Sequence, residues 1–383
     1  NNPVVRGLVL DCLRYWASEY HIDGFRFDLA TILGRDPWGA PLPNPPLLES
    51  LAFDPILSSC KLIAEAWDAG GLYQVGTFPA FGRWGEWNGK YRDCARRFLK
   101  GDAGMVGQMA QRIQGSPDLY RPSGRSPATS VNFITCHDGF TLADLVSYND
   151  KHNHANGEYN RDGGDDNHSW NCGAEGWTDD PGIQQLRQRQ MMNAFAMLLT
   201  SRGTPMLLMG DELGRSQHGN NNAYCLDSPL SWVDWTLLDT NAHLHQFVRA
   251  LVQFRHQHPC LRVNAFDPPA SQHFPSCSFH GTSPWQPDWS DDSRQLAWMM
   301  SVDVAADPTA SGSMPDTVYV ACNMAHYASW FELPQPPVGC IWSLCFNTGD
   351  SSSPVLEASP ALDNAGLLVG ERSVVILRVS PVD

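Results

Sequence analysis

The chain has 383 residues, a hydrophobic content of 42% and a formal charge of −15, from 26 Lys plus Arg against 41 Asp plus Glu. This length predicts two domains, or one large domain with an appendage, and the hydrophobic content is enough for a sizeable core. The acidic balance argues against nucleic acid and anionic membranes as partners, whereas a neutral polymer is indifferent to it. No apolar run is long enough to span a bilayer.

The cysteines and histidines give no sign of a metal centre. The eleven cysteines are scattered without a CxxC pair, and the closest two are Cys340 and Cys345. This spacing predicts neither a disulfide framework nor a zinc module, and we interpret the cysteines as mostly buried thiols in a reducing compartment. The histidine pairs are spaced i, i+2 and diverge on a helix. We therefore predict no metal and no cofactor.

The first predicted element is a helix at residues 4–20. Its apolar side chains recur at helical spacing, at Val5, Leu8, Val9, Cys12, Leu13 and Trp16. The helix leads into the stretch DGFRFDLA, residues 23–30. If this stretch is a strand, Phe25 and Phe27 share one face, while Arg26 and Asp28 share the other.

A charged pair on the inward face is unusual for a buried strand. Parallel α/β barrel enzymes place catalytic groups where strands run into the following loops. Arg26 and Asp28 stand at such a strand end, so the pair predicts a functional site. A structural ion pair is the alternative reading of these eight residues, because ion-pair networks resemble sites.

Further strands and helices alternate along the chain. The Pro- and Gly-rich passage at 34–46 reads as a long loop. The remaining predicted helices are at 47–58, 91–101, 183–201 and 241–257. The remaining predicted strands of this part are at 61–65, 85–91, 130–138 and 204–212. Strands that alternate with helices predict a parallel sheet with right-handed crossovers.

This pattern suits a (β/α)8 TIM barrel, which has eight strands, whereas we predict five. We therefore expect an α/β fold in which residues 1–260 form the C-terminal five or so units of a barrel that lacks its first strands, as the C-terminal part of a longer protein. Residues 261–316 are rich in Pro, Ser and Asp and are expected to form a connector. Residues 317–383 contain strand-like runs that predict a small antiparallel β-sandwich domain.

Three carboxylates stand at the ends of separate predicted strands: Asp28, Glu65 and Asp138. Retaining cleavage of a glycosidic bond needs a carboxylate nucleophile and a carboxylic acid that protonates the leaving oxygen. The apolar neighbours of Glu65 favour its protonated form, which suits the acid. Arg26 would keep Asp28 ionised, as a nucleophile requires. Asp138, beside His137, is a candidate for gripping sugar hydroxyls in the transition state.

These segments resemble a known family. DGFRFDLA, LIAEAWD and NFITCHDGF look like three of the short regions that mark the α-amylase superfamily of glycoside hydrolases, in the usual order. The flanking segments AGGLYQVG, EWNGKYRD, SWNCGAEG, GDELGRSQHGNNNAY and PDWSDDSRQLA narrow the match to its isoamylase and glycogen-debranching branch. The resemblance runs from residue 3 to about residue 300. A first conserved region of the Asp-Val-Val-x-Asn-His type has no counterpart in this sequence.

The resemblance implies a debranching hydrolase that cuts α-1,6-glucosidic branch points of starch or glycogen with water. It implies that Asp28 is the nucleophile, Glu65 the proton donor and Asp138 the transition-state stabiliser. Arg26 and His137 would contact substrate. Aromatic side chains of the loops are candidates for stacking on glucose rings, with Trp67 foremost, although aromatic residues also serve as core packing.

Several alternatives stay open. A non-catalytic glucan-binding or scaffold subunit is one, and a transglycosylase of the same superfamily is another. The expected partner is a branched α-glucan, with no nucleic acid and no membrane, and the resemblance adds homo- or hetero-oligomers with isoamylase-type subunits. We expect an intracellular protein, in the plastid stroma of a plant or alga in preference to bacterial cytoplasm. Activity is expected of the full-length protein, and this chain alone is expected to be inactive.

Overall fold

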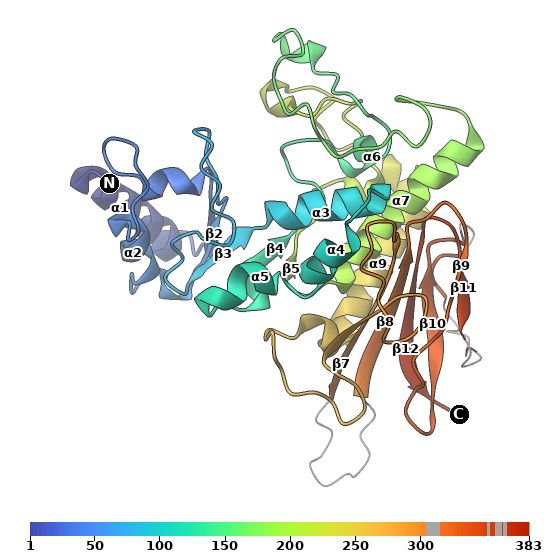
Figure 1. Cartoon of the computed structure of the whole chain (residues 1–383). Coiled ribbons are helices and arrows are strands. Elements are labelled where there is room, and N and C mark those ends of the chain that lie inside the picture. Colours follow the sequence, from blue (N-terminus) through green and yellow to red (C-terminus); the bar gives the residue numbers. More distant parts are fainter. Residues whose placement is uncertain (304–314, 351–352, 357–361, 363–365, 383) are drawn as a thin grey trace.

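The computed structural model describes residues 1–303, 315–350, 353–356, 362 and 366–382, and these residues form three β-sheets and the helices that pack against them (Figure 1). The first sheet is parallel and has the order β1-β2-β3-β4-β5. Its strands are β1 (Gly24–Phe27), β2 (Lys61–Ala64), β3 (Trp84–Trp87), β4 (Ser130–Asn132) and β5 (Thr204–Pro205). All four neighbouring pairs run parallel, as the alternating pattern predicted.

Two of these strands are much shorter than predicted. The segment 130–138 pairs only over β4, and the segment 204–212 pairs only over β5. Beyond β4 the backbone bends into a loop, where the amide of Gly139 bonds to the carbonyl of Asn221 instead of a neighbouring strand. β5 has one neighbour among the described strands, so few ladder bonds extend it.

The helices follow the predicted alternation. They are α1 (Pro3–Glu19), α2 (Pro46–Ala52), α3 (Gly89–Lys100), α4 (Val106–Ile113), α5 (Pro117–Tyr120), α6 (Leu142–Leu145), α7 (Pro181–Thr200), α8 (Leu237–Thr240) and α9 (Ala242–Gln257). α4 to α6 and α8 were not predicted. In the described part of the chain, none of the helices combines the length and apolar character that a bilayer span requires.

The predicted apolar face of α1 is only partly buried. Asn2 caps the helix by accepting a hydrogen bond from the amide of Val4. Leu13 packs against the core beneath the first strands. Leu8 and Trp16, by contrast, are exposed, at 63% and 48%. Helical spacing identified the element correctly, but it did not tell which apolar side chains find a partner.

The second sheet is antiparallel and has the order β10-β12-β8-β7-β6, and a two-stranded sheet pairs β11 with β9. The strands are β6 (Cys277–His280), β7 (Gln295–Asp303), β8 (Pro315–Asn323), β9 (Ser329–Phe331), β10 (Cys340–Asn347), β11 (Leu367–Val369) and β12 (Ser373–Pro381). The strand-like runs of the predicted β domain correspond to β8, β9, β10 and β12.

The expected connector at 261–316 needs a correction. β6 and β7 lie within it, and β7 pairs with β8 along nine residues. The Pro-, Ser- and Asp-rich composition of the segment as a whole concealed the buried run from Leu296 to Met300. Residues 304–314 of the expected connector lie outside the described residues, as do residues 351–352, 357–361, 363–365 and 383 of the expected β domain.

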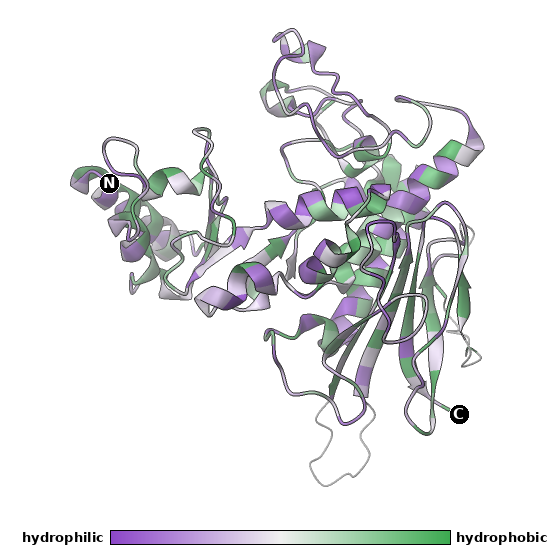
Figure 2. Ribbon diagram, in the orientation of Figure 1, coloured by the Kyte–Doolittle hydropathy of each residue, from purple (hydrophilic) through white to green (hydrophobic). Residues whose placement is uncertain are grey.

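The large antiparallel sheet has an apolar core on each face. On one face, Ile376 packs with residues of α3, α4, α7 and α9. On the other face, Leu377 packs with Phe331 and Val369 of the small sheet. Figure 2 shows the apolar character running along these strands, whereas the long loops above α6 and α7 are largely hydrophilic. The core on the Ile376 face therefore joins the large antiparallel sheet to the helices.

Candidate active site

Arg26 joins two of the three predicted carboxylates. Its Nη1 atom lies 2.7 Å from Oδ1 of Asp28, and its Nη2 atom lies 3.0 Å from Oε1 of Glu65. β1 carries Arg26 and β2 ends one residue before Glu65, and the parallel register aligns Phe27 with Ala64. The two carboxylates therefore meet at one guanidinium because adjacent parallel strands end at the same edge.

Glu65 and Asp28 have different environments. The Glu65 side chain is 3% exposed, and its Oε2 atom accepts a hydrogen bond of 2.7 Å from the amide of Leu29. Burial raises the pKa of Glu65, and the negative charges of Asp28 and Asp138 raise it further, against the opposing effect of Leu29 and Arg26. The Asp28 side chain is 69% exposed. Glu65 is thus suited to carry a proton, and Asp28 to remain accessible.

Trp87 links the third carboxylate, Asp138, to the other two. The guanidinium of Arg26 is 4.2 Å from the ring centroid of Trp87. The His137 ring lies 5.7 Å from the ring of Trp87, in an edge-on arrangement. His137 Nε2 is in turn 3.6 Å from Asp138 Oδ2. The structure therefore brings together all five polar residues predicted from the strand ends.

Trp67 forms an aromatic wall next to this cluster. Its ring stacks on that of Tyr73, with centroids 5.9 Å apart and planes 14° from parallel. The two rings contribute to a pocket of about 260 Å³, lined also by Asp68, Gly71, Leu72 and Arg92. Flat aromatic surfaces with polar groups beside them suit the apolar faces and hydroxyl edges of a sugar ring.

Four other tryptophan side chains near the predicted loops divide into exposed and packed ones. Trp38 and Trp177 are 90% and 83% exposed, in loops. Trp84 is buried and contacts Phe27 and Phe78, so it is a core residue. Trp170 lies under the guanidinium of Arg372. Sequence alone did not separate these cases, because all four lie near predicted loops.

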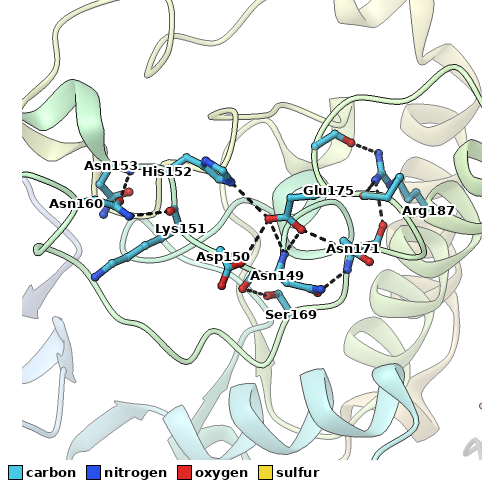
Figure 3. A network of polar contacts seen from close by, with 12 residues as sticks. Asn149, Asp150, Lys151, His152, Asn153, Asn160, Ser169, Asn171, Glu175 and Arg187 are labelled. Carbon is cyan, nitrogen blue, oxygen red and sulfur yellow. Dashed lines mark hydrogen bonds and ion pairs between the residues drawn. The ribbon is translucent and has the colours of Figure 1, made fainter.

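The long loop at 149–180 is ordered by hydrogen bonds. Figure 3 shows Glu175 at their centre, where it accepts from the amides of Asn149 and Asp150 and from the side chain of Asn171. Arg187 of α7 donates to the carbonyl of Asn171. The loop is therefore folded around the carboxylate of Glu175.

Two buried carboxylates near the site escaped the sequence reasoning. Asp211 follows β5, and Asp144 lies in α6. Both bond to the loops around the candidate site. The Gly-Asp-Glu sequence at the end of a predicted strand was the signal for Asp211. Among the described residues, no group of three or more His, Cys, Asp and Glu side chains has the arrangement of a metal site.

Comparison with known proteins places this geometry in context. Residues 278–360 match the protein family described as Isoamylase 1-3, C-terminal. Isoamylase 1, chloroplastic, of Oryza sativa subsp. japonica is 45% identical over 368 residues, which cover 91% of this chain and 44% of the rice protein. The glycogen operon protein GlgX homolog of Mycobacterium bovis is 44% identical over 388 residues, covering 98% of this chain and 53% of that protein.

The fold agrees with these relatives. Pullulanase type I from Bacillus subtilis, solved in complex with maltose, has a TM-score of 0.70 at 19% identity, over 98% of this chain and 46% of that one. The α/β fold, with one parallel sheet and two antiparallel sheets among the described residues, is therefore similar to the fold of this pullulanase. In sequence, the chain is a homologue of isoamylases and glycogen debranching enzymes, which confirms the resemblance of its motifs. It spans about half the length of these curated relatives.

Proposed function

We propose that the full-length protein is a debranching glycoside hydrolase that cleaves α-1,6-glucosidic branch points of starch or glycogen. The observation that carries the proposal is the pairing of Asp28 and Glu65 on the single guanidinium of Arg26. The relatives named as isoamylases and glycogen debranching enzymes support the substrate class. The branched α-glucan is the proposed partner, and the chloroplastic plant relatives support a plastid location.

The proposed mechanism divides the work between unlike carboxyl groups. Asp28 attacks the anomeric carbon as the nucleophile and forms a covalent glycosyl intermediate. Glu65 protonates the leaving oxygen and then takes a proton from the water that releases the sugar. The buried setting of Glu65 supports the acid role. Asp138 and His137 bind the sugar as its ring distorts, and Trp67 stacks on a neighbouring glucose.

We further propose that the parallel sheet is part of a (β/α)8 barrel, with residues 1–260 belonging to it. Five parallel strands in sequence order, with the candidate carboxylates at one edge, support this arrangement. We place the start of the β domain before β6, at about residue 277. The match of residues 278–360 to an isoamylase C-terminal family supports this boundary.

The test is hydrolysis of glycogen by the full-length protein, followed as new reducing ends. Native protein should release linear oligosaccharides, and Asp28→Asn should reduce the rate at least about 1,000-fold, because the nucleophile is lost. Asp11→Asn is the matched control, since Asp11 is also an exposed carboxylate that pairs with an arginine, but on α1. Equal rates for native protein and Asp28→Asn would exclude Asp28 as the nucleophile and would favour the alternative, a non-catalytic scaffold subunit. Longer or re-branched chains would indicate a transglycosylase.

A further inference from the structure

The turn that carries Asp138 is held at both ends by one buried carboxylate. Asp211 bonds through Oδ2 to the hydroxyl of Thr135, three residues before Asp138. Its Oδ1 atom accepts a hydrogen bond of 2.9 Å from the amide of Leu142, four residues after Asp138. Asp211 is 1% exposed. A residue of the loop after β5 thus bonds to both ends of the turn in the loop after β4.

The contact between the two loops is reciprocal. Asp144, in α6 at the end of the loop after β4, accepts hydrogen bonds from the hydroxyl of Ser216 and the amide of Gln217, in the loop after β5. The amide of Gly139 donates to the carbonyl of Asn221 over 3.0 Å. Figure 1 shows the two loops side by side, beyond the carboxyl ends of β4 and β5. Each loop therefore supplies a buried aspartate that accepts from the other.

A buried carboxylate is costly unless its oxygens are bonded, so these contacts define a specific geometry. Asp138 itself has a side chain that is 63% exposed. Packing constrains such a side chain weakly, and its position follows the backbone of its turn. The residues that fix that backbone, among them Asp211, therefore decide where the Asp138 carboxylate stands relative to Glu65.

We propose that Asp211 is a positioning residue, which holds the 135–142 turn so that Asp138 stays placed to bind the distorted sugar. This inference rests on the proposed function. Asp211 touches no substrate in this role. A displaced Asp138 weakens an interaction made in the transition state, so its loss lowers kcat more than it raises KM.

The variants Asp211→Ala and Asp211→Asn in the full-length protein test the proposal. Alanine removes both hydrogen bonds, whereas asparagine keeps an acceptor for the Leu142 amide and gains a donor for Thr135. We expect Asp211→Ala to lower kcat on glycogen about 10- to 100-fold with KM changed less than about 2-fold, as a misplacement of ~1 Å does. Asp211→Asn should restore kcat to within about 3-fold of native. Hydrogen exchange of the Leu142 amide should accelerate in Asp211→Ala alone.

A matched control separates positioning from general destabilisation. Asn193 is also a fully buried polar residue, and it bonds to Thr348 and Arg372 on the β domain, away from the turn. Asn193→Ala should lower the melting temperature and leave kcat unchanged. If Asp211→Ala does not fold, Thr135→Val, which removes one of the two bonds, should show the same kcat effect in smaller measure.

Three outcomes overturn the proposal. They are native kcat in a folded Asp211→Ala variant, native Leu142 exchange in that variant, and an Asp211→Asn variant as impaired as Asp211→Ala. Failure of the proposed function is a different result, since native protein would then release no reducing ends. In that case the exchange experiment alone decides: faster Leu142 exchange in Asp211→Ala supports the holding role, and unchanged exchange excludes it.

Discussion

The chemistry of single residues depends here on which side chain is buried. Asp28 and Glu65 share Arg26, yet only Glu65 is removed from water. Burial favours its neutral form, and the shared guanidinium opposes that effect. The balance between these two influences sets the pH range in which Glu65 carries the proton that the proposed acid must deliver.

Replacing Arg26 should shift that range. Because the Arg26 charge lowers the pKa of Glu65, Arg26→Gln should raise it further. A general acid acts only when protonated, so the fall of kcat/KM at high pH should move to higher pH, while the maximal rate drops. The measurement is a pH profile of glycogen hydrolysis. Arg14→Gln, whose arginine pairs with Asp54 on the outer side, should leave the profile in place. A shift to lower pH would contradict the assignment of Glu65 as the acid.

Asp211 should make folding stability depend on pH. Burial raises its pKa to about 7, with Glu212 raising it and Leu142, Thr135 and Arg215 opposing. The folded state then holds a proton that the unfolded state releases above about pH 4. Stability therefore falls as pH rises from about 4 to 7, on the order of 1 kcal/mol per pH unit from this group.

The measurement for Asp211 is the difference in unfolding free energy between native protein and Asp211→Asn at pH 5 and pH 7. Asparagine has no such proton, so native protein should lose stability relative to the variant over this interval. A constant difference would mean that Asp211 is ionised throughout.

At the scale of single elements, the end of α3 is set by its contact with the β domain. α3 ends at Lys100 and is capped by Gly101, which has a φ of 86°. A Cβ at this position would lie 2.4 Å from Nη1 of Arg372 and 3.1 Å from the carbonyl oxygen of Met324. The end of the helix is therefore pressed against the β domain, where only glycine combines the left-handed conformation with the close approach.

Gly101→Ala should consequently destabilise the protein by about 2–3 kcal/mol, from backbone strain plus the displaced neighbour. Gly124 provides the comparison, because its φ is 68° and a Cβ added there would meet nothing within 4 Å. Gly124→Ala should cost only the strain, about 1 kcal/mol. Urea unfolding of both variants measures the difference, and equal losses would show that the contact with Arg372 adds nothing.

At the scale of the whole molecule, the β domain and the helices share a core. Ile376 and Leu377 are neighbours on β12, are both fully buried, and face opposite ways. Ile376 belongs to the core shared with the helices, and Leu377 to the core between the two antiparallel sheets. One strand therefore supports two interfaces through alternate side chains.

Truncating Ile376 and truncating Leu377 should destabilise different parts of the molecule. Ile376→Ala and Leu377→Ala should each cost about 2–5 kcal/mol. Hydrogen exchange should accelerate in α7 and α9 for Ile376→Ala, and chiefly in β9 and β11 for Leu377→Ala. The same exchange pattern in both variants would indicate that the molecule opens as one cooperative unit.

The sequence by itself determined the alternation of parallel strands and helices, the strand ends next to Asp28 and Glu65, and the kinship with isoamylases. Those features are local, because periodicity and short motifs depend on residues close in the chain. The sequence reading missed β6, β7 and the correct extent of β4 and β5.

Only the tertiary structure decided which apolar side chains of α1 pack against the core, which aromatic residues pack and which face a pocket, and that Asp211 bonds to the turn of Asp138. The physical reason is common to all three. Much of the burial and hydrogen bonding at these positions comes from residues distant in the chain, such as Leu142 and Asp211, which are 69 positions apart. No local pattern encodes a partner at such a separation, so folding alone brings the two together.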